Sequence, residues 1–431
     1  HEQASSTSAE AYARITGNIG VCVVTTGPGG TNAITGVLGA WLDSIPILVI
    51  SGQVRRELIG AGKTLRQLGD QEINIVDIVK PITKYAVTVM DPQSIRYHLE
   101  KAAYLGSHGR PGPVWLDVPL DVQGAEIDEK TLEGFMLSEL SENYKTTPNP
   151  GELMALQTLI QQAKRPIIIA GHGIRLAHAL PAFRLFIEKY QIPFVGTYLA
   201  TDYVQGDHHL FIGRTGLKGD RAGNFAMQNS DLILSIGSRL GVTVIGYDPK
   251  QFAREANIVV VDIDPVEHQK KTLEIDVFIN ADAKEFLQSF KPEHLPDISK
   301  WRERCLAWKE RYPVCLPEYR QATQGINLYY FMDELSKQLA DGAVVVSDAG
   351  SAVYVPAQGF KAKNNQRLIL SGAQAELGFT IPACIGVSLA EKSGQVVGIT
   401  GDGSLQTNIQ ELQTIVEYKL PIKLFVWNND G

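Results

Sequence analysis

Two apolar strands near the end of the chain, predicted at residues 395–400 and 422–427, are separated by a glycine turn and an amphipathic helix. The first strand leads into a Gly-Asp-Gly turn at 401–403, and the second ends at an Asn-Asn pair at 428–429. The interval between the two motifs suits one helix followed by one strand. A parallel arrangement would therefore return both motifs to the same edge of one sheet. This unit predicts an α/β domain whose polar residues gather at its strand ends.

The two motifs have the chemistry of a joint metal and diphosphate site. Glycines on either side of Asp402 permit a tight turn, and the helix that follows presents free backbone amides and its positive dipole end to an anion. Asp402 and Asn429 offer oxygen ligands of the kind that Mg²⁺ prefers, often together with substrate phosphates. Either motif alone is an ordinary turn signal. Their pairing in one unit favours a site for a metal-bound diphosphate.

Length, charge and cysteine usage narrow the function classes. A chain of 431 residues exceeds one ordinary core, so two or three α/β domains are expected. A net charge of −7 gives no basic surface for nucleic acid or an anionic membrane, and no apolar run is long enough for a transmembrane helix. The four cysteines are scattered, which fits a reducing compartment such as the cytoplasm. Both ends of the chain are expected to be cut.

Strands and helices alternate in three blocks, which predicts three doubly wound parallel-sheet α/β domains. The first block, residues 1–127, opens with a helical pattern that Gly17 ends and continues into a β-branched strand, a glycine-rich turn and a second strand. The second block spans residues 150–290, and the third spans residues 325–431. Polar or proline-containing linkers separate them. We expect the first domain to lack its N-terminal part and the third its C-terminal part.

The Gly-Asp-Gly turn, followed after about two dozen residues by Asn-Asn, resembles the cofactor signature of thiamine diphosphate enzymes. The resemblance implies that Asp402, the Asn429 side chain and the Gly431 carbonyl anchor the diphosphate through Mg²⁺. It also implies that the three domains are pyrimidine-binding, central and diphosphate-binding. An apolar residue that holds the cofactor in a bent conformation is implied at Leu377. The further cofactor contacts implied by the resemblance are Gly27, Gly403 and Ser404.

Glu2 is similar to the catalytic glutamate of that family. A glutamate at a helix start is otherwise an ordinary favourable charge, but here a Gly-Pro-Gly-Gly-Thr-Asn turn follows at 27–32. The resemblance implies that Glu2 protonates N1′ of the aminopyrimidine ring. This protonation favours the imino form, whose nitrogen removes the thiazolium proton. A glutamate buried for this task is expected to have a raised pKa.

Four segments resemble the acetolactate synthase branch most closely: TTGPGGTNAITG, DSIPILVISGQV, KPITKYAV and RPGPVWLDVPLDV. The resemblance implies that Gln71 and Lys84 line the reaction pocket. Asp70 stands where that branch has an aromatic residue, and Gln374 and Glu376 replace its usual small residues. A more polar pocket and a hydroxylated acceptor are therefore expected, unless Asp70 faces solvent or caps a helix.

The central domain has glycine turns after its strands that suit a nucleotide, although such turns alone are weak signals. In acetolactate synthases the equivalent domain binds FAD. The resemblance carries this role to Gly171, Gly173, Arg239 and Asp262. However, the RFDDR-like segment of that branch is absent after Arg239, so a central domain without a cofactor stays open.

The function implied is a carboligase that decarboxylates pyruvate and transfers the two-carbon unit to a keto acceptor. Its active site would form across a homodimer or homotetramer. A keto-sugar nucleotide as acceptor, a flavin-dependent oxidase and a truncated non-catalytic paralogue remain alternatives. A simple pyruvate-type decarboxylase is disfavoured, because the adjacent histidine pair expected between residues 64 and 72 is absent.

Overall fold

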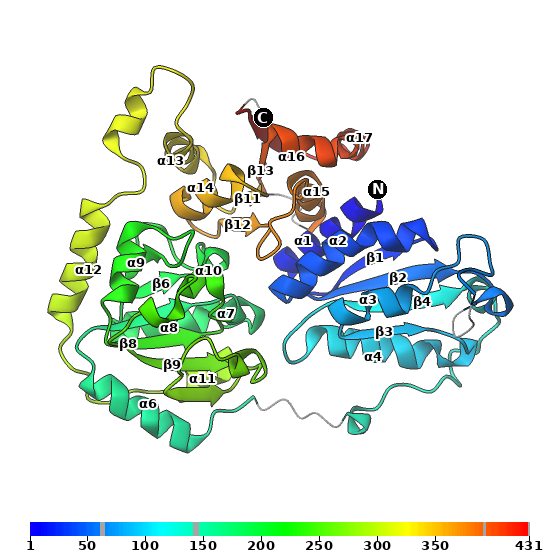
Figure 1. Ribbon diagram of the computed structural model, residues 1–431, viewed down its shortest axis with the longest axis horizontal. Helices are drawn as coiled ribbons and strands as arrows, with labels where there is room; N and C mark the ends of the chain where they lie inside the picture. The colour runs from blue at the N-terminus through cyan, green and yellow to red at the C-terminus, as the bar shows by residue number, and fades with distance from the viewer. Residues whose placement is uncertain (61–64, 141–145, 391–393, 430–431) are drawn as a thin grey trace. The chain divides into compact units, whose positions relative to one another are not determined.

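The computed structural model describes residues 1–60, 65–140, 146–390 and 394–429 (Figure 1). These residues form three sheets of parallel strands with helices between them, which confirms the predicted α/β class. The chain divides into two compact units. The first contains His1–Asn143, Val344–Ala352 and Ile369–Gly431, and the second contains Tyr144–Ala343 and Val353–Leu368. Within the described stretches, no helix is both long enough and apolar enough to cross a membrane.

The N-terminal sheet has the strand order β1-β2-β4-β3. Its strands are β1 (Gly20–Val24), β2 (Ile47–Gln53), β3 (Tyr85–Thr88) and β4 (Val114–Pro119). The main helices around it are α1 (Glu2–Thr16), α2 (Pro28–Asp43), α3 (Ile75–Val79) and α4 (Ile95–Ser107). Helix α1 ends as predicted, because Gly17 adopts a left-handed conformation and donates its amide to the Ala13 carbonyl. All six residues of β4 are buried, as expected for an interior parallel strand.

The central sheet has the strand order β10-β9-β8-β5-β6-β7. Its strands are β5 (Pro166–Ala170), β6 (Phe194–Gly196), β7 (Phe211–Arg214), β8 (Leu232–Ile236), β9 (Asn257–Asp262) and β10 (Val277–Asn280). The helices that accompany these strands along the chain include α6 (Pro150–Gln162), α7 (Gly173–Leu176), α8 (Leu180–Tyr190), α9 (Arg221–Gln228), α11 (Ala283–Ser289) and α12 (Ser299–Arg311). Strand order reverses between β5 and β8, and this switch point is where doubly wound sheets bind ligands.

The C-terminal sheet has the strand order β12-β11-β13-β14. Its strands are β11 (Val344–Ser347), β12 (Arg367–Leu370), β13 (Val396–Gly401) and β14 (Ile422–Trp427). The helices of this part of the chain are α13 (Leu328–Gln338), α14 (Ser351–Gly359), α15 (Thr380–Ala390), α16 (Asp402–Thr407) and α17 (Leu412–Glu417). Strand β13 pairs in parallel with β14, with Gly401 opposite Trp427. The two predicted motifs therefore do end at the same sheet edge.

The single helix predicted after the Gly-Asp-Gly turn is divided in the structure. Helix α16 stops before Asn408, whose φ of −129° departs from helical geometry, and α17 starts only at Leu412. The Asn408 side chain is buried and donates a hydrogen bond to the Gly378 carbonyl over 2.9 Å. This long-range bond holds Asn408 in a non-helical conformation, which interrupts the helix. The expected apolar face is partly exposed as a result, with Val416 68% accessible.

Helix α1 joins the N-terminal and C-terminal sheets within the first compact unit. It packs against both α2 and α15, and Figure 1 shows it beside α15. Ala11 of α1 belongs to the same apolar core as Ala383 and Cys384 of α15 and Val344 of β11. The helix that starts at Glu2 is therefore fixed by the core of the C-terminal sheet.

Candidate active site

The glycine turn after β1 packs directly on the loop that contains Gln71. Gly27 has a φ of 61°, and a Cβ at this position would lie 2.5 Å from the Gln71 carbonyl oxygen. Only glycine fits such a close approach in this conformation. Gln71 itself has a φ of 60°, which is uncommon for a residue with a side chain. The predicted residues Gly27 and Gln71 thus lie together, and the exposed Gln71 side chain stands at the carboxyl edge of the sheet.

Glu2 lies in the first turn of α1 beside the same glycine turn. Its Oε2 accepts a hydrogen bond from Asn32 Nδ2 over 3.1 Å, and Oε1 lies 3.7 Å from the point where a Cβ on Gly29 would stand. The Glu2 carboxylate therefore lies in contact distance of the turn. Glu2 is half-buried in the single chain. Glu2 and the 27–32 turn, which the resemblance paired, therefore lie side by side.

A buried hydrogen-bond network lies next to the 27–32 turn, at the strand ends of the N-terminal sheet. Asp117 at the end of β4 accepts hydrogen bonds from Ser51 (2.6 Å), Gln53 (3.1 Å) and Thr88 (3.1 Å). Gln53 also donates to the Ile73 carbonyl over 2.8 Å. Burial raises the pKa of Asp117, whereas the three hydrogen bonds lower it. The network connects three strand ends to the loop that contains Gln71.

Sequence reasoning missed this network. The residues lie at the carboxyl ends of β2, β3 and β4, separated by up to 66 positions in the chain. Polar residues at the ends of otherwise apolar strands are the signal that would have found them. The Thr26 hydroxyl extends the network, because it donates to Gln53 Oε1 over 3.2 Å.

Lys84 is not brought to Gln71 within this chain. It directly precedes β3, at the amino edge of a parallel sheet, whereas Gly27 and Gln71 follow strands at the carboxyl edge. Lys84 Nζ donates to the carbonyls of His108 (2.6 Å) and Arg110 (2.8 Å). In the single chain these bonds fix the segment that leads into β4.

The Gly-Asp-Gly turn lies at the carboxyl edge of the C-terminal sheet. Asp402 starts α16 and is half-buried, and Asn429 is exposed just past β14. A Cβ on Gly403 would meet no atom within 4 Å, so the backbone there is open to a ligand. The strand register places the predicted metal ligands Asp402 and Asn429 at neighbouring strand ends. Gly431, the third predicted ligand, lies outside the described residues.

Buried Asp348 positions the residues beside this turn. Its Oδ2 accepts hydrogen bonds from Thr400 (2.8 Å) and Ser404 (2.6 Å). Ser404 Oγ in turn accepts the backbone amide of Gly378 over 2.8 Å. Ser404, predicted as a cofactor contact, therefore connects the turn to the loop that contains Leu377. The Leu377 side chain is 57% exposed at this edge, although leucine is usually buried.

Gln374 and Glu376 do not simply enlarge a polar pocket. Their Oε1 atoms are buried and lie 3.2 and 3.4 Å from the point where a Cβ on Gly39 of α2 would stand. Glu10 Oε2 lies 3.4 Å from the same point. In the part of the chain that the structure describes, none of these three oxygens has a hydrogen-bond partner. These oxygens therefore face the helix layer formed by α1 and α2. Asp70 is exposed.

In the central sheet, the glycine loops meet at the switch point. A Cβ on Gly171, after β5, would lie 2.2 Å from the Gly237 carbonyl oxygen, after β8. The Gly173 amide donates to that carbonyl over 2.9 Å. This packing leaves no room for side chains between the two loops. The predicted residues Gly171 and Gly173 thus form one backbone surface with Gly237.

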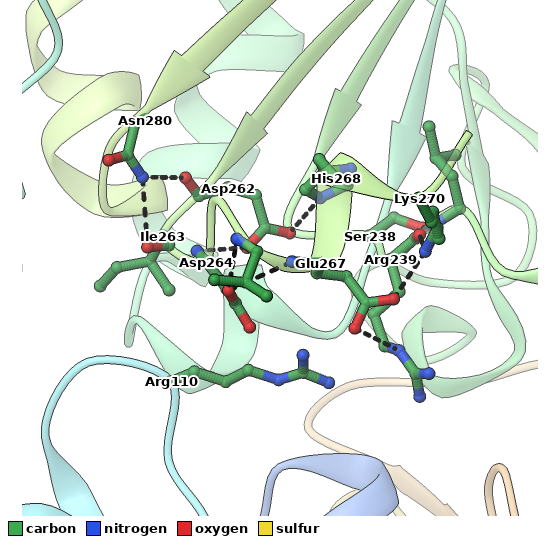
Figure 2. A network of polar contacts seen from close by, with 12 residues as sticks. Arg110, Ser238, Arg239, Asp262, Ile263, Asp264, Glu267, His268, Lys270 and Asn280 are labelled. Atoms are coloured by element: carbon green, nitrogen blue, oxygen red, sulfur yellow. Dashed lines mark hydrogen bonds and ion pairs between the residues drawn. The ribbon is translucent and has the colours of Figure 1, made fainter. Parts of the chain in front are cut away.

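Two further residues were predicted as nucleotide contacts: Arg239 follows β8, and Asp262 is the last residue of the adjacent strand β9. Figure 2 shows both residues paired with the segment that follows Asp264: Asp262 lies beside His268, and Arg239 lies beside Glu267. His268 Nε2 lies 3.2 Å from Asp262 Oδ2, and Arg239 Nε lies 3.3 Å from Glu267 Oε2. Lys270 Nζ is 2.6 Å from Glu267 Oε1. All four predicted residues therefore lie at one edge of this sheet.

Known protein families match each of the three parts of the chain that form a sheet. Family models of the thiamine pyrophosphate enzymes match the N-terminal binding domain at residues 1–78, the central domain at 153–290 and the C-terminal binding domain at 348–431. The acetolactate synthase large subunit of Lactococcus lactis subsp. lactis is 36% identical over 431 residues, which is 100% of this chain and 73% of that protein.

Two other relatives give the same result. The acetolactate synthase large subunit of Porphyra purpurea is 33% identical and is covered over 72% of its length by the whole of this chain. The probable acetolactate synthase large subunit of Methanocaldococcus jannaschii is 33% identical with 73% coverage, again across the whole chain. Together with the placement of Glu2 and the Gly-Asp-Gly turn, these matches show that the chain belongs to the thiamine pyrophosphate enzymes, among the relatives of acetolactate synthase large subunits.

Proposed function

We propose that this protein is a thiamine diphosphate-dependent carboligase that decarboxylates pyruvate and transfers the two-carbon unit to a keto acceptor. One observation carries the proposal: residues that suit both halves of the cofactor site lie at sheet edges of this chain. Glu2 stands against the 27–32 turn at one sheet edge, and Asp402 and Asn429 stand at neighbouring strand ends of another. The relatives named above are acetolactate synthase large subunits.

The side chains fit the cofactor at both ends. Bound thiamine diphosphate supplies a carbon nucleophile and an electron sink for decarboxylation. Asp402 and Asn429 present the oxygen donors that suit Mg²⁺, and the open backbone at Gly403 leaves room for a diphosphate. Exposed Leu377 provides an apolar contact for the ring system. These residues would bind and orient the cofactor.

Proton transfer is the role of Glu2. Its carboxyl group would exchange a proton with the ring nitrogen of the bound aminopyrimidine, while Asn32 fixes the position of Oε2. Gln71 stands in the loop against Gly27 and would orient the donor or the acceptor. Lys84 would serve the pocket only from another copy of the chain, because its own sheet edge faces away from Gln71.

A homodimer or homotetramer would complete the site. Strand β1 lies at the edge of its sheet and exposes Val21 by 53% and Val23 by 70%. An edge strand with exposed apolar side chains suits a surface that another chain covers. This supports the proposed contact between subunits.

The acceptor is proposed to be a second keto acid, with a keto-sugar nucleotide as the other candidate. The buried orientation of Gln374 and Glu376 favours the keto acid, because these side chains do not add polar atoms to an open pocket. Exposed Asp70, in the loop next to Gln71, favours the hydroxylated acceptor. Product analysis decides between them.

To test this proposal, the protein is incubated with thiamine diphosphate, Mg²⁺ and pyruvate. Carbon dioxide release and the products are then measured with and without each acceptor. We expect Glu2→Gln to reduce turnover by about 10²–10⁴-fold, since it removes a general acid and base without changing shape. Glu57→Gln, which alters an exposed carboxylate, should leave turnover unchanged. Cofactor binding without turnover of any keto acid would contradict the proposal.

A further inference from the structure

A basic cavity of about 980 Å³ lies at the amino edge of the central sheet. Its walls come from the segments that directly precede β5, β8 and β9, together with helix α12. The glycine loops and Asp262 lie past the opposite, carboxyl ends of the same strands. The cavity is therefore separate from the nucleotide candidate site. The charged residues that line it are Lys164, Arg165, Arg254, Glu255, Lys300 and Arg304.

The charge of this cavity contrasts with that of the whole chain. Five cationic side chains and one carboxylate line it, in a protein whose net charge is −7. Cations often compensate helix C-termini, and α6 and α9 both end near this edge. Each helix end contributes roughly −0.5 of an elementary charge. Two such ends, Glu255 and the nearby carboxylates of Asp231 and Asp297 offset most, but not all, of the charge of the five cations.

Two of the arginines are held in position by neighbouring groups. Arg165 Nε donates to the Asn229 carbonyl over 2.7 Å, and its terminal nitrogen lies 3.0 Å from Glu255. The Arg304 guanidinium lies over the Trp308 ring, 5.5 Å from its centroid. An ordered guanidinium loses less conformational entropy when it binds an anion. The cavity thus has preoriented donors.

The other three cations have no ion pair among the residues that the structure describes. These are Lys164, Arg254 and Lys300. The nearby carboxylate of Asp231 instead accepts the backbone amides of residues 164 and 165, over 2.9 and 2.8 Å. Lys300 has Asp297 in its surroundings, and that carboxylate accepts the Ser299 amide. These three side chains are exposed and come from separate segments that meet at one surface, which favours binding of an anion there.

We propose that this cavity binds a small ligand with a diphosphate group, at a site distinct from the thiamine and nucleotide sites. Guanidinium and ammonium groups are the usual partners of phosphate oxygens. The volume lies within the range of small-molecule and cofactor pockets, so a nucleoside diphosphate would fit as well as pyrophosphate alone. The inference does not depend on the proposed reaction.

Calorimetric titration tests the proposal. The protein is first saturated with thiamine diphosphate, Mg²⁺ and FAD, so that its other diphosphate sites are filled, and is then titrated with pyrophosphate or ADP at constant ionic strength. The double variant Arg254→Gln/Lys300→Gln removes two of the cations that have no ion pair. The matched control is Lys130→Gln/Lys271→Gln, which removes the same charge from exposed positions outside the cavity.

We expect saturable binding that weakens at least tenfold in the cavity variant and not in the control. Equal binding of pyrophosphate and ADP would show that the diphosphate suffices, and tighter binding of ADP would add a nucleoside to the recognised group. Both results support the proposal. Identical affinity in the two double variants would overturn it, as would binding of an oligonucleotide in the absence of binding by either diphosphate.

Discussion

Glu10 is a buried carboxyl group among like charges. Its surroundings are Arg14 on the same helix, Asp43 at the end of α2 and Glu376 in the loop before α15. The Arg14 guanidinium pairs with Glu10 and also with Asp43, over 2.6 Å to the latter. One arginine cannot neutralise three carboxylates. Burial raises the pKa of Glu10 from 4.5 to about 8, and the charges of Glu376 and Asp43 add to this effect. Burial also raises the pKa of Glu376.

This arrangement predicts a stability loss in mildly alkaline solution. Glu10 holds its proton more tightly in the folded protein, so its contribution is fully present below pH 4.5 and is lost as the pH rises through about 8. Glu10→Gln cannot ionise and should show a shallower fall in the free energy of unfolding across that window. Urea unfolding at a series of pH values measures it, with Glu57→Gln as control. Parallel curves for the wild type and Glu10→Gln would contradict the assignment.

At the scale of elements, the loop that contains Gln71 is held by strand ends rather than by its own sequence. Gln53 is the centre of the network, because its amide reaches Asp117, the Ile73 carbonyl and the Thr26 hydroxyl. It is 6% exposed, so solvent cannot replace these partners. The geometry of the loop therefore depends on the register of β2 and β4.

Gln53→Leu is expected to lower the free energy of unfolding by about 1–3 kcal/mol, because it leaves buried polar groups without partners. Turnover should fall and KM for pyruvate should rise, as the loop loses its support. Gln123→Leu is the matched control, since Gln123 is exposed and donates to the nearby Val118 carbonyl. Equal effects of the two substitutions would argue against a positioning role for Gln53.

The sequence predicts elements that repeat a local pattern and misses those that long-range contacts decide. Apolar β-branched runs and glycine turns predicted the strands that hold Asp402 and Asn429 correctly. The break at Asn408 was missed, because it depends on the Gly378 carbonyl 30 residues away in the chain. The Asp117 network was missed for the same reason. Lys84 was grouped with Gln71 by resemblance, and only the sheet topology separates them within one chain.

At the scale of the whole molecule, the compact units cross the predicted domain borders. Residues 353–368 belong to the unit that contains the central sheet. Arg367 lies 3.0 Å from buried Asp202, and Arg214 donates to the Gln358 carbonyl over 2.6 Å. Such contacts join residues more than 140 positions apart. No local sequence pattern predicts these contacts. The alternation of strands and helices could therefore predict the three sheets but not the two compact units.

The central sheet leads to a prediction about flavin. If its carboxyl edge binds FAD, the purified protein should be yellow, and denaturation should release flavin in proportion to protein. Arg239→Gln should reduce the bound flavin, because it removes the cation paired with Glu267 at that edge. Arg254→Gln, at the opposite edge, should retain it. A colourless protein that retains no flavin after incubation with FAD and desalting would favour a central domain without a cofactor.

Helix α1 extends from the carboxyl group of Glu2 to the apolar core beneath the Gly-Asp-Gly turn. Ala11 lies nine residues beyond Glu2, or about 14 Å along a helix. A helix transmits a displacement at one end to the other with little loss. Changes in the size of the side chains packed around Ala11 would therefore move the Glu2 carboxyl group, which they never touch. If Glu2 has the proposed role in proton transfer, the chemistry of the site limits substitution in this core as well as packing.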